Sequence, residues 1–416
     1  HAYTNIPICC PARQSFLCGR RSETFGSLWN YDITLPIPAL EPGGYTWSEE
    51  LKNSGYNTAY IGKWHVHPTQ TPTAYGYDTY VDSWSDYHHL RLDKYGHRLD
   101  CGWEGCVDSV SIDDTHTHWL ARQAIDTMRR LSEEHEPWHI RLDFDEPHLP
   151  CCPQQEFAAL YTADTVEPWP GFGDDFAGKP YIQKQQVLNW GLESYQWADW
   201  APTVARYYAI ITQMDDAIGR VLAALDHLAD RANTLVIFTA DHGDMCGSHQ
   251  MMDKHYVMYD DVMRVPFVAR WPDVIPAGSV RHEYIYQFLD TARTVPDIAG
   301  LDAAKNRWHG ESLLPLLKGE VPKDWRREAV ASYNGQQFGL YTQRMIVSGE
   351  WKYIWNTTDV DELYHLANDE GERNNLIDHP DVKEVLRALR KRLYEVLASD
   401  GDFLVSRNGM SWVKGQ

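Results

Sequence analysis

The sequence predicts an α/β protein with a large, mainly parallel sheet flanked by helices and a smaller C-terminal α+β domain. Residues 234–239 form a continuous apolar, β-branched run, which is typical of a strand buried on both faces of a parallel sheet. Residues 204–228, directly before that run, carry apolar side chains at helical spacing. A helix followed by a buried strand is the alternation of an α/β domain. The chain ends differently, with short strands before one amphipathic helix.

Earlier segments fit the same architecture. Two further strands are predicted at Thr58–Ile61 and Trp138–Phe144, where short apolar runs are bounded by polar residues. Residues 84–119 and 168–200 are aromatic, charged and only weakly periodic. We therefore expect these two segments to be long excursions from the sheet that contact substrate.

The C-terminal part has its own pattern. Strands are predicted at 338–348 and 351–355, and the segment 361–366 follows them. Residues 382–397 then place their apolar side chains on one helical stripe. Because this order differs from the preceding alternation, the sequence predicts a catalytic α/β domain over 1–319 and an α+β subdomain over 320–416.

The composition is that of a globular protein and restricts its partners. Of 416 residues, 43% are hydrophobic and 23% are charged. No apolar run approaches the roughly 18 residues that cross a bilayer. A formal net charge of −21 argues against a nucleic-acid groove or a polybasic membrane patch, so an anionic ligand needs a locally positive pocket. The sequence begins at His1 with no Met, no charged n-region and no apolar h-region, and it looks like a fragment or a processed form, which leaves the compartment open. The oligomeric state is open as well.

Cysteine and tryptophan usage leaves two questions open. The eight cysteines are too few for a disulfide scaffold. Cys101-x4-Cys106 is either a small bridge or half of a zinc site, but no second half is evident in the sequence. The 17 tryptophans either fill a large core or provide flat surfaces for sugars.

Polar clusters follow three of the predicted strands. They occupy residues 62–65, 145–148 and 241–244, each at the point where a strand ends. In open α/β sheets, ligands bind outside the carboxyl ends of the strands. The three clusters are therefore expected to converge on one site.

A fourth cluster lies near the start of the chain. Pro11 suits the first turn of a helix and Gly19 suits its end, which places Cys9 at the helix N-terminus. Backbone N–H groups at such an end favour an anionic ligand. The planar guanidinium of Arg13 is suited to the same anion.

The motif Cys9-x-Pro11-x-Arg13, followed by Leu17-Cys-Gly-Arg20, resembles the signature of the sulfatase family. Further family motifs match in order at 62–65, 147–148, 239–244, 254, 264–266, 309–313 and 362–366. Because these matches extend over nearly the whole chain, the sequence is identified as a member of the formylglycine-dependent sulfatases of the alkaline-phosphatase-like superfamily.

The resemblance implies a nucleophile made from Cys9. In this family a formylglycine-generating enzyme oxidises the first cysteine of the motif to an aldehyde, which hydrates to a geminal diol. One hydroxyl attacks sulfur and the alcohol leaves, and elimination through the other hydroxyl then expels sulfate. A serine at this position cannot use the elimination step.

The resemblance also implies roles for the remaining matched residues. Lys63 and Arg13 would hold the diol and the metal, and His65 would remove the proton from the second hydroxyl. His148 and Lys254 would contact the sulfate, with His148 as the candidate for protonating the leaving oxygen. Concentrated positive charge is what makes a sulfate ester electrophilic.

A divalent metal is implied by the same resemblance. Asp241 and His242 match one pair of metal ligands, and Cys9, once modified, is a further ligand. The other pair comes, in this family, from an N-terminal strand that precedes the first residue of this sequence. Calcium is the usual metal and suits carboxylate oxygens. The histidine leaves manganese or magnesium as alternatives.

The predicted reaction is hydrolysis of a sulfate ester, and the tryptophan-rich excursions favour a sulfated carbohydrate as substrate. One alternative is a phosphonate or phosphate diester hydrolase that uses the same aldehyde. A second is a non-catalytic protein that binds sulfated glycans, although the complete set of matched residues argues against it.

Overall fold

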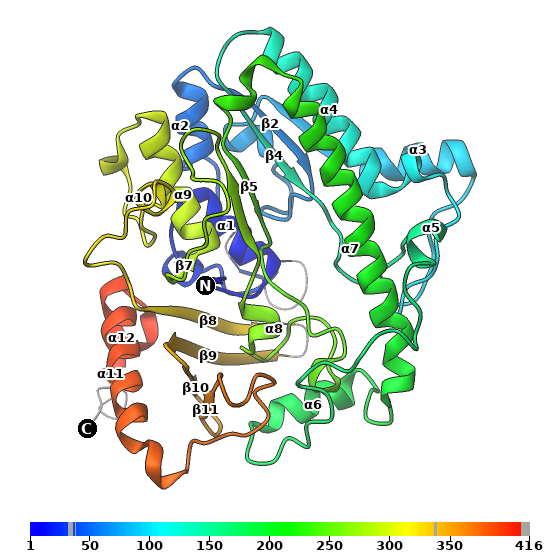
Figure 1. Ribbon diagram of the computed structural model, residues 1–416. Coiled ribbons are helices and arrows are strands. Elements are labelled where there is room, and N and C mark those ends of the chain that lie inside the picture. Colours follow the sequence, from blue (N-terminus) through cyan, green and yellow to red (C-terminus); the bar gives the residue numbers. More distant parts are fainter. Residues whose placement is uncertain (32–35, 38, 337–338, 409–416) are drawn as a thin grey trace.

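The computed structural model describes residues 1–31, 36, 37, 39–336 and 339–408. Helices lie on both sides of the strands β2, β4 and β5, and the C-terminal strands form a separate sheet below them (Figure 1). The mixed α/β architecture predicted from the sequence is confirmed. Where the catalytic part ends and the C-terminal subdomain begins stays a prediction.

A parallel sheet forms the centre of the larger part. Strand β2 (Asn57–Gly62) lies between β3 (Thr79–Asp82) and β4 (Trp138–Asp143), and both pairings are parallel. The strands predicted at 58–61 and 138–144 are therefore confirmed, with ends that differ by a residue. The carboxyl ends of β2 and β4 lie together because Gly62 pairs with Asp143.

Strand β5 (Val236–Thr239) is present where it was predicted. The prediction that it lies buried on both faces of a parallel sheet was wrong. It pairs antiparallel with β6 (Phe267–Arg270), and Phe238 keeps 37% of its surface exposed. Within the described residues, pairing occurs along one edge of β5 and one edge of β4 only. An apolar run indicates a strand but does not define the direction of its partner, which explains the error.

Two layers of helices cover the sheet. On one side, α4 (His116–Glu133) packs against β2, β4 and α7 (Trp197–Asp226). On the other side, α9 (Gln287–Ala299) packs against α1 and α2 (Figure 1). The bounds of those two helices are Cys9–Cys18 and Trp47–Asn53. The helix predicted over 204–228 is thus longer at its start, where Gln196 and Asp199 form a capping box.

The predicted excursions are partly helical. Helix α3 (Ser85–Tyr95) lies in the first and α6 (Tyr181–Asn189) in the second. Neither helix has a strong apolar stripe, so the periodicity of the sequence does not predict either of them. The remaining short elements of this part are β1 (Ala2–Tyr3), α5 (Gln155–Ala158), α8 (Asp260–Met263), β7 (Ile285–Tyr286) and α10 (Leu314–Leu317).

The C-terminal strands form a four-stranded antiparallel sheet in the order β11-β10-β9-β8. Their bounds are Glu328–Gln336 for β8, Gly339–Ser348 for β9, Trp351–Asn356 for β10 and Glu362–His365 for β11. Helix α11 (Lys383–Asp400) packs on β9 and β10, and α12 (Phe403–Asn408) follows it. These elements confirm the predicted strands and helix, except that Phe338 lies outside the described residues.

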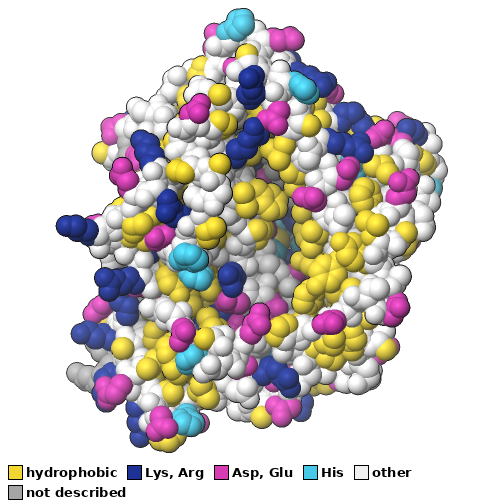
Figure 2. Space-filling view, in the orientation of Figure 1, with side chains coloured by type: hydrophobic (Ala, Val, Ile, Leu, Met, Phe, Trp, Pro, Cys, Tyr) yellow, Lys and Arg dark blue, Asp and Glu magenta, His cyan; other side chains and the backbone are white. Residues whose placement is uncertain are grey.

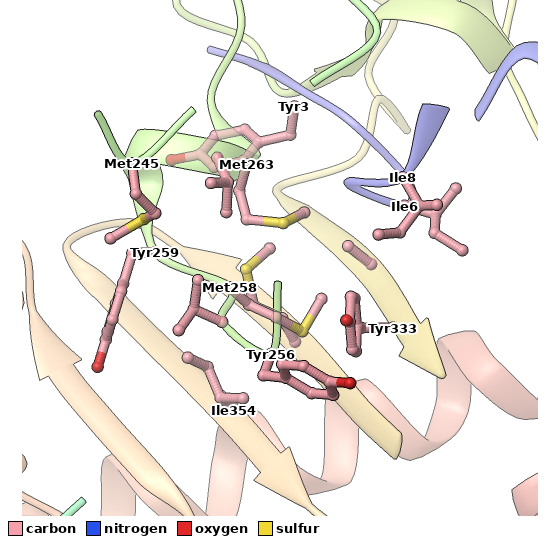
Figure 3. Packing of buried hydrophobic residues seen from close by; sticks show 14 of the residues in the cluster. Tyr3, Ile6, Ile8, Met245, Tyr256, Met258, Tyr259, Met263, Tyr333 and Ile354 are labelled. Carbon is pink, nitrogen blue, oxygen red and sulfur yellow. The ribbon is translucent and has the colours of Figure 1, made fainter. Parts of the chain in front are cut away.

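One apolar core joins the two parts of the molecule. Ile6 and Ile8, which precede α1, pack in the same cluster as Tyr333 of β8 and Ile354 of β10 (Figure 3). The segment 245–263 contributes several more buried residues to this cluster (Figure 3). The C-terminal sheet therefore supports the chain on both sides of Cys9 and Lys254.

Several of the tryptophans fill the core. Trp47, Trp200 and Trp355 are among the largest fully buried side chains, whereas Trp84 is exposed. In the part of the chain that the structure describes, no helix is both long and apolar enough to span a membrane.

Substitution of Leu393 tests the packing of α11 on the sheet. This side chain has no exposed surface and packs in a cluster that includes Val330 and Tyr353. We expect Leu393→Ala to lower the free energy of unfolding by about 2–5 kcal/mol, because it removes buried methyl groups and leaves a cavity. Urea denaturation measures the change. The exposed Lys391→Ala is the control, and equal midpoints for both variants would contradict this packing.

Candidate active site

Helix α1 presents Cys9 at its first position. The preceding residue, Ile8, is extended, and the helix ends at Gly19 in the left-handed region with φ 64°. Cys9 is only 2% exposed, and its Sγ lies 3.1 Å from Nε2 of His242. Burial alone would raise the pKa of the Cys9 thiol, but the charges of Lys254 and Lys63 hold it well below its usual value. The position is thus built for a negative charge.

Arg13, one turn further along α1, connects three segments of the site. Its Nε donates to Asp241 at 3.0 Å, and its Nη1 donates to Asp143 at 2.7 Å and to the carbonyl of Lys63 at 2.8 Å. The expected convergence of the strand ends is realised here, because these partners follow β5, end β4 and follow β2. Arg13 is buried, so both ion pairs are shielded from water.

Asp143 is a residue that the sequence motifs missed. It accepts hydrogen bonds from Arg13, Arg141 and the hydroxyl of Tyr60. Burial would raise its pKa, but Arg141 and Arg13 hold the pKa below the usual range, so the carboxylate is charged. The guanidinium of Arg141 lies 4.7 Å from the ring centre of Phe16. An acidic residue at the carboxyl end of a predicted strand was the available signal.

The turn after β2 depends on Gly62. Its φ is 106°, and a Cβ at this position would lie 1.9 Å from the carbonyl oxygen of Asp143. Only glycine permits this close approach. The turn aligns the N–H of Lys63 with the same carbonyl at 3.0 Å and brings the Lys63 charge within reach of Cys9. His65 follows with φ 46°. Its ring lies edge-on to that of Tyr31, with 5.3 Å between the two ring centres.

Lys254 and His148 form a close pair beside Cys9. Lys254 Nζ lies 2.8 Å from His148 Nε2 and 2.7 Å from the carboxylate of Asp253. Burial would lower the pKa of Lys254, but Asp253 and Cys9 hold it above its usual value, so the ammonium is charged. His148 Nδ1 lies 2.8 Å from the carbonyl of Leu149, an acceptor. These partners assign the proton to Nδ1 and make Nε2 the acceptor for Lys254.

Three donor atoms are suitably placed for a metal ion. One atom each from Cys9, Asp241 and His242 lies within 4.8 Å of the others. His242 Nδ1 lies 2.8 Å from the carbonyl of Gly243, so Nε2 is the ring nitrogen that faces Cys9 and could bind a cation between them. The pKa of Asp241 is lowered: burial opposes this, but His242 and Arg13 outweigh it. A charged carboxylate, an imidazole and the position-9 side chain fit a divalent ion.

His116 supports the loop that carries His148. Its Nδ1 lies 3.0 Å from a carboxylate oxygen of Glu146, and its Nε2 lies 3.1 Å from the carbonyl of Ser83. Burial would lower the pKa of His116, but Glu146 and Asp145 raise it to about 9. Helix α4 is thereby tied to the segment that follows β4.

The structure brings most of the predicted site residues together. Direct contacts or mutual charge effects connect Cys9, Arg13, Lys63, His148, Asp241, His242 and Lys254. His65 lies two residues beyond Lys63, on the side of Tyr31. Asp143 and Asp253 complete the charge network but belong to no predicted motif.

The mixed α/β fold and the buried charges at the carboxyl ends of its strands define an α/β protein with an anion- and cation-binding polar site at the strand ends. A family model described as Sulfatase matches residues 1–301. The chain therefore belongs to the sulfatase family and is a sulfuric ester hydrolase. A second model, described as N-sulphoglucosamine sulphohydrolase, C-terminal, matches residues 247–399.

Curated relatives support the same family. The uncharacterized sulfatase YidJ of Escherichia coli (strain K12) is 29% identical over 394 residues, which cover 91% of this chain and 75% of that protein. The choline-sulfatase of Rhizobium meliloti (strain 1021) is 26% identical, with coverage of 91% and 75%.

Solved structures share the fold. A protein in complex with its substrate D-glucosamine-2-N,6-O-disulfate has a TM-score of 0.76 at 20% identity, covering 97% of this chain and 90% of that one. A phosphonate monoester hydrolase of Agrobacterium radiobacter has a TM-score of 0.79 at 22% identity, covering 96% and 88%.

The His116–Glu146 pair predicts a pH-dependent stability. The folded pKa of about 9 exceeds the usual 6.5, so the stabilisation is complete below pH 6.5 and is lost as the pH rises through 9. We expect the free energy of unfolding to fall over that interval, and this decline to flatten in His116→Gln. Denaturant midpoints from pH 6 to pH 10 measure it, and the same decline in both proteins would disprove the assignment.

Proposed function

We propose that this sulfatase uses a formylglycine made from Cys9 and one divalent metal ion, with a sulfated carbohydrate as substrate. The observation that carries the proposal is the position of Cys9: buried at a helix N-terminus, with Sγ 3.1 Å from His242 and the charges of Lys254 and Lys63 nearby. Modification would require a formylglycine-generating enzyme as a maturation partner.

The lysines and Arg13 provide a positive pocket in a strongly acidic protein. The chain carries a formal net charge of −21, yet Lys63 and Lys254 both lower the pKa of the group at position 9. Two cations that face one point bind the sulfate oxygens and stabilise the negative charge that develops on them. Arg13 is occupied by Asp143 and Asp241, so it holds the carboxylates in position.

The metal site would be formed by Asp241, His242 and the modified Cys9, with calcium as the first candidate and manganese or magnesium as alternatives. When bound, the aldehyde hydrate supplies the nucleophilic oxygen and the metal supplies Lewis-acid charge. Arg13 keeps the Asp241 carboxylate oriented toward that position.

Proton transfer is assigned to the histidines and Lys254. Because Lys254 donates toward Nε2 of His148, the proton nearest the leaving oxygen is shared by this pair. His148 remains the proposed proton donor, with Lys254 supplying the proton to Nε2, from which the leaving oxygen takes it. His65, close to Lys63 in sequence, is the proposed base for position 9.

A carbohydrate substrate is supported by the names of several relatives. They include an ulvan-active sulfatase of Formosa agariphila and an N-acetylglucosamine-6-O-sulfatase of Bacteroides thetaiotaomicron. The match of residues 247–399 to an N-sulphoglucosamine sulphohydrolase model points to the same class. The proposed division into residues 1–319 and 320–416 would make the C-terminal part a support for this site.

Peptide mass spectrometry across Cys9, on protein purified from its own host, tests the proposal. We expect an aldehyde at this position and turnover of sulfate esters, while Cys9→Ala and Cys9→Ser lose turnover. An unmodified thiol in active protein would exclude the nucleophile. Faster turnover of a phosphonate or phosphate diester would favour the alternative hydrolase, and binding of sulfated glycans without cleavage would favour a binding protein.

Leaving-group dependence tests the Lys254–His148 pair. We expect His148→Ala and Lys254→Ala to lower kcat/KM about 10²–10⁴-fold for a sulfate ester of a sugar alcohol. With an activated aryl sulfate, His148→Ala should lose much less, because a good leaving group needs no proton. Equal losses on both substrates would rule out proton donation by His148. The exposed His227→Ala, outside both predicted substrate-contacting segments, serves as the control.

A further inference from the structure

Three cysteines converge at a place separate from the residues proposed for catalysis. Sγ of Cys152 lies 2.8 Å from Sγ of Cys101 and 3.8 Å from Sγ of Cys106. All three sulfur atoms lie within 4.8 Å of one another, and each residue is half-buried. The sequence offered Cys101-x4-Cys106 as half of a site, and the structure supplies the missing member from a distant segment.

The backbone holds the two segments together. The N–H of Gly105 donates to the carbonyl of Gly102 at 2.9 Å, which closes a tight turn and brings Cys101 and Cys106 to the same side. Gly105 has φ 82°, and a Cβ there would lie 2.1 Å from the carbonyl oxygen of Cys151. Only glycine allows the turn to approach the second segment this closely.

Further backbone contacts fix the segment that carries Cys152. The N–H of Asp108 donates to the carbonyl of Pro153 at 2.8 Å, and Asp108 also forms a bridge with Gln154. The side chain of Asp108 is paired with the buried Arg91. The three thiols are therefore presented by a rigid frame.

We propose that Cys101, Cys106 and Cys152 bind one thiophilic divalent metal ion of the Zn²⁺ type. An all-sulfur donor set selects soft or borderline metals over calcium and magnesium. The three thiols become thiolates on binding, so three protons are released for each ion bound. The fourth position is left to water, because the cluster is half-buried.

The spacing of the sulfur atoms suits this role. Sulfurs at about 2.3 Å from a tetrahedral Zn²⁺ lie roughly 3.7 Å apart. Cys106 and Cys152 already have this separation, at 3.8 Å. Cys101 needs an outward movement of about 1 Å, which a rotation about χ1 provides. A disulfide would use two of these sulfurs and leave the third without a role.

The proposed metal would join two loops close to the candidate active site. Cys152 follows His148 by four residues in the same segment, and the turn at Cys101–Cys106 carries Trp103, which packs on Trp200. A metal here therefore stabilises the backbone next to the Lys254–His148 pair. This role does not depend on the chemistry proposed for Cys9.

Titration with Cd²⁺, a spectroscopic substitute for Zn²⁺, tests the site. Reduced, chelator-treated Cys9→Ala protein is used, so that no sulfur remains at the catalytic position. We expect an ultraviolet sulfur-to-cadmium band that saturates at one sulfur-bound Cd²⁺ per chain and is lost when Zn²⁺ is added. Cys106→Ser and Cys152→Ser should weaken binding more than about tenfold. Cys18→Ser, a buried thiol outside the cluster, should bind as the parent does.

Alkylation of the parent protein gives a readout that needs no folded cluster variant. Zn²⁺ should protect Cys101, Cys106 and Cys152 from a thiol reagent, as measured by peptide mass spectrometry. The proposal fails if no band forms, if the cluster variants bind Cd²⁺ like Cys18→Ser, or if Zn²⁺ leaves the three thiols reactive. A Cys101–Cys152 disulfide that persists in metal-loaded protein would also overturn it.

Discussion

The candidate site depends on one buried cation, Arg13. A single guanidinium connects helix α1 with the end of β4 and the turn after β5, through Asp143 and Asp241. Without it, two carboxylates would remain in a water-poor environment with much of their charge uncompensated, which is far more costly than the loss of a surface pair. The positions of Cys9 and of the candidate metal ligands thus follow from the same interaction. Since Arg13 is neutralised by these carboxylates, the positive charge that favours an anion at position 9 comes from Lys254 and Lys63.

The second requirement is the support given by the C-terminal sheet. Tyr333 and Ile354 pack in the core that also contains Ile8, immediately before Cys9, and Met258, a few residues beyond Lys254 (Figure 3). The surface of the larger part has a hollow near its middle, bordered by apolar side chains (Figure 2). Apolar packing and charge thus come from different elements. The C-terminal sheet provides the apolar packing, and the turns after β2, β4 and β5 provide the charged side chains of the candidate site.

Short-range sequence patterns predicted the individual helices and strands and the motifs of the candidate site. Strands β2 and β4 and helices α7 and α11 follow from apolar periodicity, and the ordered motifs identified most of the candidate site. The antiparallel partner of β5 was not predictable, because strand direction is decided by distant residues. The same is true of Asp143, whose role depends on Arg13 and Tyr60, and of Cys152, which joins Cys101 only through tertiary packing. The features that the sequence did not predict all depend on contacts between residues far apart in the chain.

The first residues of the chain complete their packing only with residues made much later. Strand β1 pairs with β7, and the carbonyl of Asn5 accepts a hydrogen bond from the N–H of Ser332 at 3.0 Å. At a synthesis rate of about 5–20 residues per second, the partner segment follows Cys9 by tens of seconds. Cys9 is only 2% exposed in the folded chain, and its neighbours His242 and Lys254 are also made long after it, so its burial is incomplete during that interval. Any enzyme that modifies this side chain must therefore reach it before folding is complete.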